Sequence, residues 1–240
     1  MINAGPDPVF LQLREHLIQL AKARRRFGVL PFGIKEIDDR LPGGGLALGA
    51  LHEVSEAGPA HEYAAMATLF VAGVLAGLKG PVLWCVHSRD LFAPGIAAAG
   101  LHPDRVIYAE TFRDADVLPV MEEGLRHKGL AGVVGEVVKV GLKSTRRLHL
   151  VAEKSGSVAL LLRRWRASDL TGSAAMTRWR IAPHPSNGLP VPGVGRARWQ
   201  LDLVRVRGGE PAFWIVEACD EKGRLALSPD LADGPRPPTH

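Results

Sequence analysis

Short apolar stretches and longer amphipathic stretches alternate along the middle of the chain. The apolar stretches have the length of buried strands, and the stretches between them show helical spacing of apolar positions. We expect strands at 50–54, 81–87, 105–109, 131–136 and 157–162, and helices at about 62–78, 91–99, 115–127 and 143–154. Because strands that alternate with helices build parallel sheets, the pattern predicts a doubly wound α/β fold with a mostly parallel sheet flanked by helices.

The pattern changes after residue 170. Residues 178–181, 198–207 and 212–218 alternate apolar and polar positions with no helical stretch between them, which is typical of antiparallel strands. Four prolines and three glycines in residues 183–195 indicate a loop. The α/β core is therefore predicted to end in an antiparallel β meander.

The N-terminal residues form a separate pattern. Phe10, Leu13 and Leu17 recur at helical spacing with polar residues between them, which predicts an amphipathic helix over about residues 8–26. The helix ends in three arginines, which either complement the helix dipole or dock a partner. We expect three parts in the chain, namely an N-terminal helical arm at 1–28, a core at 29–232 and a flexible tail at 233–240.

Composition limits the class of protein. With 240 residues and 46% hydrophobic positions, the chain is long enough to bury one core. Cys85 and Cys219 match no disulfide or metal pattern, and no signal peptide precedes the core, so a cytoplasmic setting is expected. The longest apolar run, at 63–78, is shorter than the about 20 residues of a membrane span, so no membrane contact is expected.

Positive charge is concentrated in one part of the chain. The net charge is +5, but residues 143–207 contain 13 Lys and Arg against three Asp and Glu, a local +10 that leaves −5 for the rest. Tryptophans stand beside arginines there, a pairing found where phosphates are neutralised and bases stack, or where a protein partner is anchored. Alternatively, the tryptophans lie in the core and the arginines line a solvated face. The candidates for contact with nucleic acid or a partner protein are Arg163, Arg164, Trp165, Arg166, Arg178, Trp179 and Arg180.

A glycine-rich motif begins the core. Residues 32–54, FGIKEIDDRLPGGGLALGALHEV, resemble the start of the RecA-like core, in which a Gly-rich hairpin leads into a strand that ends before the phosphate loop. The match rests on fixed spacing at ten positions, whereas a run of three glycines alone would be weak evidence.

The residues that follow do not match a phosphate loop. The motif GxxxxGK[ST] surrounds phosphates with backbone N–H groups and contacts them through its lysine. In this chain Glu56 and His61 stand at its glycines, Glu62 at its lysine and Tyr63 at its Ser/Thr, while Gly58 still permits a tight turn. Since carboxylates repel a triphosphate, we expect this loop to connect strand and helix without binding nucleotide.

Two further positions bear on catalysis. In RecA-like ATPases a glutamate orients the attacking water after the strand that follows the first helix, and Ser88 stands there in this chain. Glu136 matches the acidic residue that helps hold magnesium, or else it is a strand-end residue that lies in solvent or forms a salt bridge. The nine histidines form no HExxH or Cys/His pattern. We therefore expect no catalytic residue, metal or cofactor.

A RecA-like core of this length with an altered phosphate loop resembles the ImuA family of bacterial inducible mutagenesis cassettes. The resemblance covers about residues 28–230, including the closing stretch RARWQLDLVRVRGGEPAFWIVE. It implies a non-enzymatic adaptor in SOS-induced translesion synthesis, with Phe10, Leu13 and Leu17 on a helix that joins copies of the chain. The implied partners are an ImuB-like inactive Y-family polymerase, an error-prone C-family polymerase, RecA and single-stranded DNA. The alternatives are a RecA-like DNA-dependent ATPase in DNA repair and a cell-division-inhibitor-like binding module.

Overall fold

Strands and helices follow one another in the predicted order. The computed structural model describes residues 27–58, 61–164, 172–186 and 195–228. The strands are β1 (Val29–Leu30), β2 (Leu46–Ala47), β3 (Leu51–Glu56), β4 (Val82–Val86), β5 (Val106–Glu110), β6 (Gly132–Val137), β7 (Val158–Arg163), β8 (Thr177–His184), β9 (Arg198–Val206), β10 (Ala212–Glu217) and β11 (Ala226–Leu227). The helices are α2 (Lys35–Asp38), α3 (His61–Ala76), α4 (Ala93–Ala98), α5 (Asp114–Arg126) and α6 (Leu142–Ser155), with a 3-10 turn η1 (Pro103–Arg105).

Several predicted features lie outside the described residues. They include the amphipathic arm with Phe10, Leu13 and Leu17, and the C-terminal tail. They also include Trp165 and Arg166 from residues 143–207, which we call the basic segment. The predictions for these residues therefore remain predictions.

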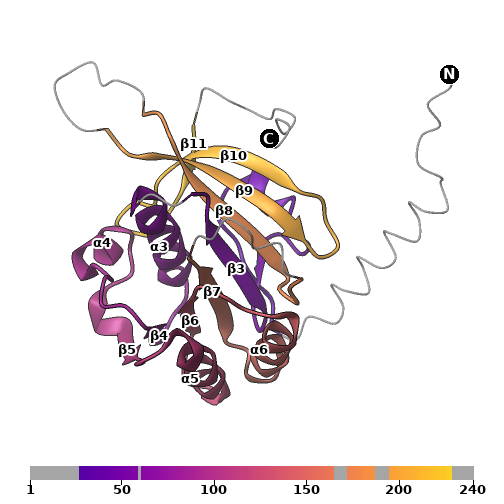
Figure 1. Cartoon of the computed structure of the whole chain (residues 1–240). Helices are drawn as coiled ribbons and strands as arrows, with labels where there is room; N and C mark the ends of the chain where they lie inside the picture. The colour runs from indigo at the N-terminus through magenta and orange to yellow at the C-terminus, as the bar shows by residue number, and fades with distance from the viewer. Residues whose placement is uncertain (1–26, 59–60, 165–171, 187–194, 229–240) are drawn as a thin grey trace, which may run out of the picture.

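One sheet of nine strands forms the centre of the fold, in the order β11-β10-β9-β8-β3-β7-β6-β4-β5 (Figure 1). The part β3-β7-β6-β4-β5 is parallel, which confirms the fold class predicted from the alternation of strands and helices. The pairs β8-β9, β9-β10 and β10-β11 are antiparallel, which confirms the meander. β1 and β2 form a separate two-stranded sheet.

β8 corrects the expectation for residues 178–181. This strand is antiparallel to β9 as expected, but it is parallel to β3, with Thr177 opposite His52. The chain leaves β7 at its carboxyl end and returns to the opposite end of the sheet before β8 begins, so β8 runs in the direction of β3. Alternating apolar and polar positions could not reveal this, because side chains alternate between faces in both kinds of pairing.

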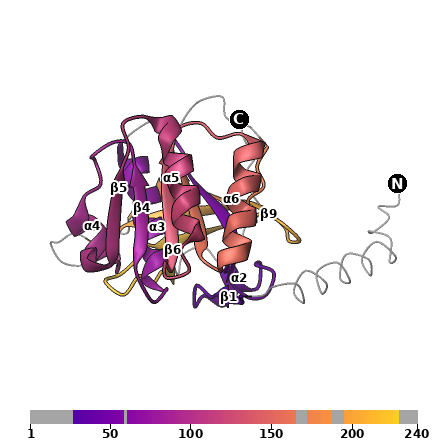
Figure 2. The same cartoon turned by 90° about the horizontal axis from the view of Figure 1, so that it is seen from below.

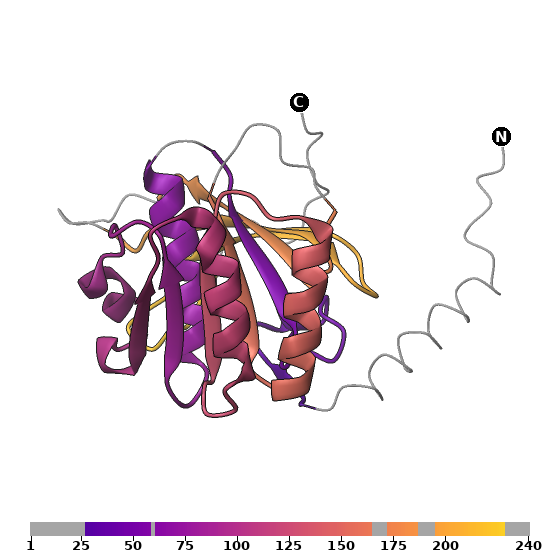
Figure 3. The same ribbon diagram turned by 60° about the horizontal axis from the view of Figure 1, so that its bottom comes forward.

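Helices cover both faces of the parallel part of the sheet. α3 packs against β3 and β8 on one face, while α5 and α6 pack on the other (Figure 2, Figure 3). Because successive residues of a strand point to opposite faces, Val54 lies in the core beneath α3 and Leu51 lies in the core beneath α6. Among the helices of the described ranges, none has the length and apolar character needed to cross a membrane.

The glycine-rich motif builds a tight turn beside the sheet. A Cβ on Gly45 would lie 2.6 Å from the carbonyl oxygen of Leu30, so only glycine allows β1 and β2 to approach this closely. The Asp38 carboxylate accepts hydrogen bonds from the backbone N–H groups of Phe32 at 2.8 Å and Gly33 at 3.0 Å. Two residues of the motif that carries the RecA-like resemblance thus have structural roles in this chain. Gly45 allows the close approach of β1 and β2, and Asp38 binds the backbone that precedes α2.

Aromatic side chains fill the core next to α3. Trp179 of β8 is 1% exposed, and its ring centroid lies 5.5 Å from that of Phe32, 5.8 Å from that of Phe70 and 6.3 Å from that of Trp214. Its Nε1 donates to Thr177 Oγ1 at 2.8 Å, which satisfies the polar atom of the ring. Trp179 therefore occupies the core position that was one alternative for the arginine-flanked tryptophans.

Replacing Trp179 by alanine removes the centre of this aromatic cluster. We expect Trp179→Ala to lower the free energy of unfolding by about 3–5 kcal/mol, since a cavity remains where the ring was. Urea unfolding followed by circular dichroism measures this change. Phe112→Ala is the matched control, because Phe112 is 98% exposed and its loss should change stability by less than about 0.5 kcal/mol. Equal effects of the two substitutions would contradict the role of Trp179.

Candidate functional site

Charged side chains gather at the carboxyl ends of three neighbouring strands. Glu56 ends β3, Glu136 lies near the end of β6, and Arg164 directly follows β7. Since β7 lies between β3 and β6 in the sheet, Arg164 emerges between the two carboxylates. This edge is the one at which open α/β sheets bind ligands. The position of the three residues therefore marks a candidate site.

Arg164 forms ion pairs with both carboxylates. Its Nη1 lies 3.0 Å from Glu56 Oε1, its Nη2 donates to Glu136 Oε2, and the same Nη2 lies 3.8 Å from Asp90 Oδ1. Glu136 also accepts a hydrogen bond from Trp84 Nε1 at 2.7 Å. The side chains of Glu136 and Glu56 are only 5% and 7% exposed, and that of Arg164 is 21% exposed. We call Arg164, Glu56, Glu136 and Asp90 the Arg164 cluster.

Burial and pairing act on these charges in opposite directions. Burial raises the pKa of Glu136, while Arg164 and the Trp84 N–H limit the rise by stabilising the carboxylate. Burial disfavours the charged form of Arg164, but the carboxylates of Glu136 and Glu56 outweigh it and raise the pKa of Arg164. The buried Glu136 carboxylate therefore depends on the arginine to stabilise its charge.

The residues at the predicted phosphate-loop positions lie next to the cluster. Glu56 belongs to it. Two residues later, a Cβ on Gly58 would lie 3.0 Å from the ring of Tyr63, so this ring packs directly against the turn. α3 begins at His61, but the side chains of His61 and Glu62 lie outside the described part of the structure. The described residues of this connection thus offer a carboxylate and an aromatic ring.

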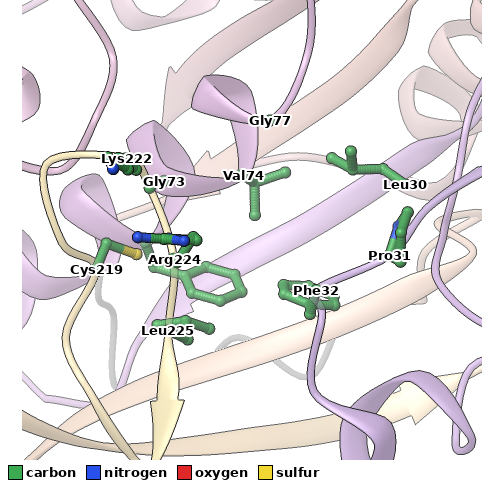
Figure 4. Close-up of a pocket in the computed structure, with 12 residues that line it drawn as sticks. Leu30, Pro31, Phe32, Gly73, Val74, Gly77, Cys219, Lys222, Arg224 and Leu225 are labelled. Carbon is green, nitrogen blue, oxygen red and sulfur yellow. The ribbon is translucent and has the colours of Figure 1, made fainter.

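A pocket of about 250 Å³ adjoins the cluster. It lies between α3, α4 and the residues after β4, with Arg164 and Asp90 as its charged groups and Leu69 and Phe92 among its apolar ones. A smaller pocket of about 100 Å³ lies at the other end of α3, between β1 and the turn before β11 (Figure 4). Burial raises the pKa of Cys219 in that pocket to about 12, so it remains a thiol. Of these two pockets, the first adjoins the Arg164 cluster, whereas the second is lined by Lys222 and Arg224.

The other contact-candidate arginines that the structure describes also form internal ion pairs. On the α6 face, Arg178 Nε donates to Glu53 Oε2 at 2.7 Å, and Arg163 Nη1 lies 3.8 Å from the same oxygen. In the meander, Arg180 Nη2 lies 2.6 Å from Asp202 Oδ2. The structure therefore distributes Arg163, Arg164, Arg178 and Arg180 over two faces and does not bring them into one surface.

Glu56 and Glu136 of the Arg164 cluster are engaged by one guanidinium, whereas the Asp90 side chain is 59% exposed. In the ranges that the structure describes, no three His, Cys, Asp or Glu side chains gather as a metal site.

An apolar surface that the sequence did not predict lies at the end strand of the sheet. β5 pairs with β4 on one side, and no described strand pairs with its outer edge. Ile107 is 51% exposed, Tyr108 42% and Phe112 98%. Ile107 lines a groove of about 650 Å³ together with Leu83 and Val120. We call Ile107, Tyr108 and Phe112 the β5 edge patch. The sequence signal for it was the pair of adjacent apolar residues Ile107 and Tyr108 in one predicted strand. Such a pair indicates an exposed apolar surface only if the strand lies at the edge of the sheet.

The fold and the site define an α/β protein with a mostly parallel sheet and an ion-pair cluster at its ligand-binding edge. No protein-family model matches the chain. Two curated relatives from Caulobacter vibrioides, strains NA1000 / CB15N and ATCC 19089 / CIP 103742 / CB 15, are each 40% identical to it over 79% of this chain and 83% of their own length, and both are named Protein ImuA. The chain therefore belongs to the ImuA family.

Removing the arginine of the cluster tests its role. We expect Arg164→Ala to destabilise the protein by about 3 kcal/mol at neutral pH, because Glu136 and Glu56 are left buried without a cation. The loss should shrink as the pH falls towards 5. With its pKa raised in the folded state, Glu136 takes up a proton on folding, and stability is lost as the pH rises through that folded pKa.

Urea unfolding at both pH values measures the effect. Arg113→Ala is the control, since Arg113 forms an exposed pair with Asp116 and should lose far less stability. A loss in Arg164→Ala that is independent of pH would contradict the assigned coupling with Glu136.

Proposed function

We propose that this protein is a non-enzymatic adaptor in SOS-induced translesion DNA synthesis. In this proposal it has a RecA-like core and binds an ImuB-like inactive Y-family polymerase. The observation that carries the proposal is the Arg164 cluster, because an internal guanidinium engages the carboxylates at the edge where a RecA-like protein would bind nucleotide and magnesium. Membership of the ImuA family supports the context.

The sheet supports a RecA-like core. β3 lies in its middle, with β7 and β8 as parallel neighbours, and the connection from β3 to α3 stands at the carboxyl edge. This is the place of the phosphate loop in a strand-loop-helix nucleotide site. The glycine-rich motif at 32–54 precedes β3 with the spacing expected for that core.

The charges at this edge disfavour a nucleotide. A triphosphate beside Glu56 would need Arg164, and an Arg164 that turned to phosphate would leave Glu136 buried without its cation. The triphosphate and the Glu136 carboxylate would thus compete for one guanidinium. The DNA-dependent ATPase alternative needs a cationic loop, and the sequence has Glu62 where its lysine would stand.

Millimolar ATP with magnesium is therefore expected to leave the melting temperature unchanged. Ligand at about 100 times its Kd would stabilise the native state by about 2.7 kcal/mol, which differential scanning fluorimetry detects readily. An ATP-binding RecA-like protein serves as the positive control. A saturable rise in melting temperature would refute the non-enzymatic proposal and favour the ATPase alternative.

The β5 edge patch is the surface that we assign to the protein partner. Its unpaired backbone N–H and C=O groups suit an added strand, and the groove beside it suits apolar side chains of an extended segment. Large exposed apolar side chains beside an unpaired strand edge favour a protein-interaction site. The C-family polymerase, RecA, self-association through the N-terminal arm and a cytoplasmic setting remain expectations that accompany this proposal.

Charge placed on the patch should prevent partner binding. We expect Ile107→Glu/Tyr108→Glu to reduce capture of the ImuB-like partner at least about tenfold, since buried apolar anchors dominate interfaces. Pull-down with purified proteins measures it. Leu150→Glu is the matched control, because Leu150 is 49% exposed on α6 and should bind like the unmodified chain.

The mass of the free protein in solution separates the possible occupants of the patch. If the double variant loses self-association while it still captures the partner, a second copy occupies the patch and the assignment is wrong. Circular dichroism confirms that both variants fold.

A further inference from the structure

The described cations of residues 143–207 include two groups. Arg163, Arg164, Arg178 and Arg180 are paired with carboxylates inside the fold. A second group is exposed and forms no ion pair with the acidic side chains of the described residues. It includes Lys143 and Arg146 at the start of α6 and Arg205 and Arg207 at the end of β9, while Lys154 is similarly exposed in the last turn of α6. The second group carries the charge that the fold leaves available to a partner.

Hydrogen bonds connect the arginines at the end of β9 with the first turns of α6. Arg205 Nη1 donates to the carbonyl oxygen of Ser173 at 2.9 Å, and Arg207 Nη2 donates to that of Ala174 at 2.9 Å. The N–H of Ala174 in turn donates to Thr145 Oγ1 at 3.1 Å, on the first turns of α6. The end of β9 is therefore tied to the helix through a short segment between them.

The spacing along α6 turns one flank of the helix towards these arginines. Arg146, His149 and Glu153 follow one another at three and four residues, so they share a flank. Arg207 interacts electrostatically with both His149 and Glu153, which places this flank beside the end of β9. We call Lys143, Arg146, Arg205 and Arg207 the cationic strip (Figure 3 shows α6 beside the meander).

Little negative charge balances the strip. Burial and the neighbouring Arg205 lower the pKa of Arg207. Burial and Arg207 likewise lower the pKa of His149. Glu153 raises the pKa of both groups. Other carboxylates on this face, Glu53 and Asp202, are buried and paired with Arg178 and Arg180. The four cations of the strip therefore exceed the negative charge beside them.

We propose that the cationic strip binds the phosphodiester backbone of DNA. Guanidinium groups held by carbonyl oxygens keep their remaining N–H donors free for phosphate, and a row of such groups on one surface matches a polymer of phosphates. The paired arginines, including Arg163 and Arg164, do not take part, since they form ion pairs with carboxylates inside the fold. This inference goes beyond the adaptor function and does not depend on partner binding.

Salt-dependent DNA binding by the full chain tests the inference. The probe is a fluorescent oligothymidylate of about 30 nucleotides, with a duplex as a second arm, and anisotropy is followed between about 50 and 200 mM salt. We expect Lys143→Gln/Arg146→Gln and Arg205→Gln/Arg207→Gln each to weaken binding about tenfold or more. Each should also reduce the slope of log affinity against log salt by about one for every phosphate that the variant no longer neutralises.

A matched control removes the same charge elsewhere. Arg113→Gln/Arg126→Gln removes two exposed arginines at the two ends of α5, where both are ion-paired, and it should keep the affinity and slope of the unmodified chain. The variant Arg205→Gln/Arg207→Gln also loses hydrogen bonds to the backbone. If this loss makes it less stable, Lys143→Gln/Arg146→Gln, which loses none of these hydrogen bonds, decides the test.

Three results would overturn the inference. The unmodified chain does not bind either DNA at about 50 mM salt, the strip variants bind as it does, or the α5 control loses as much as they do. The strip variants are expected to capture the polymerase partner normally, so failure of the DNA inference and failure of the adaptor proposal are read from different assays.

Discussion

The guanidinium of Arg164 is the contact on which the carboxyl edge of the sheet depends. It joins the end of β7 to carboxylates from the strands on either side, and it is the cation that makes the buried Glu136 and Glu56 tolerable. An α/β sheet binds phosphate at this same edge, so the ion pairs of Arg164 and a bound nucleotide would exclude one another there. The ion pairs can form because the strand order puts β7 between β3 and β6.

The alternation of side chains in the strands explains why the basic segment does not act as one surface. Arg163 and Arg164 are neighbours in sequence, but they project to opposite faces, where Glu53 and Glu136 meet them. Much of the positive charge in this segment is thus used to neutralise carboxylates that the rest of the chain supplies. Among the described residues, the unpaired Lys143 and Arg146 lie on α6, Arg205 lies on β9 and Arg207 directly follows it.

The two surfaces assigned to partners are separate in the fold. The β5 edge patch lies at the last strand of the parallel part of the sheet, whereas the cationic strip lies beside α6 and β9. The strands β8, β3, β7, β6 and β4 separate β9 from β5. Their chemistry also differs, since one is apolar with an unpaired strand edge and the other is cationic. A protein that presents two such surfaces can contact a protein and DNA at the same time, which is the property that an adaptor needs.

The order of strands and helices, the parallel class of the sheet, the meander and the likeness to the ImuA family could all be predicted from the sequence, because periodicity and motif spacing are local properties of the chain. The sequence also singled out Glu56, Glu136 and Arg164, although for separate roles. It took the folded chain to establish that these three meet, that β8 is parallel to β3, that Trp179 is buried and that β5 is an edge. The physical reason is that each of these facts depends on which strands become neighbours, and strand order is set by packing between segments far apart in the sequence.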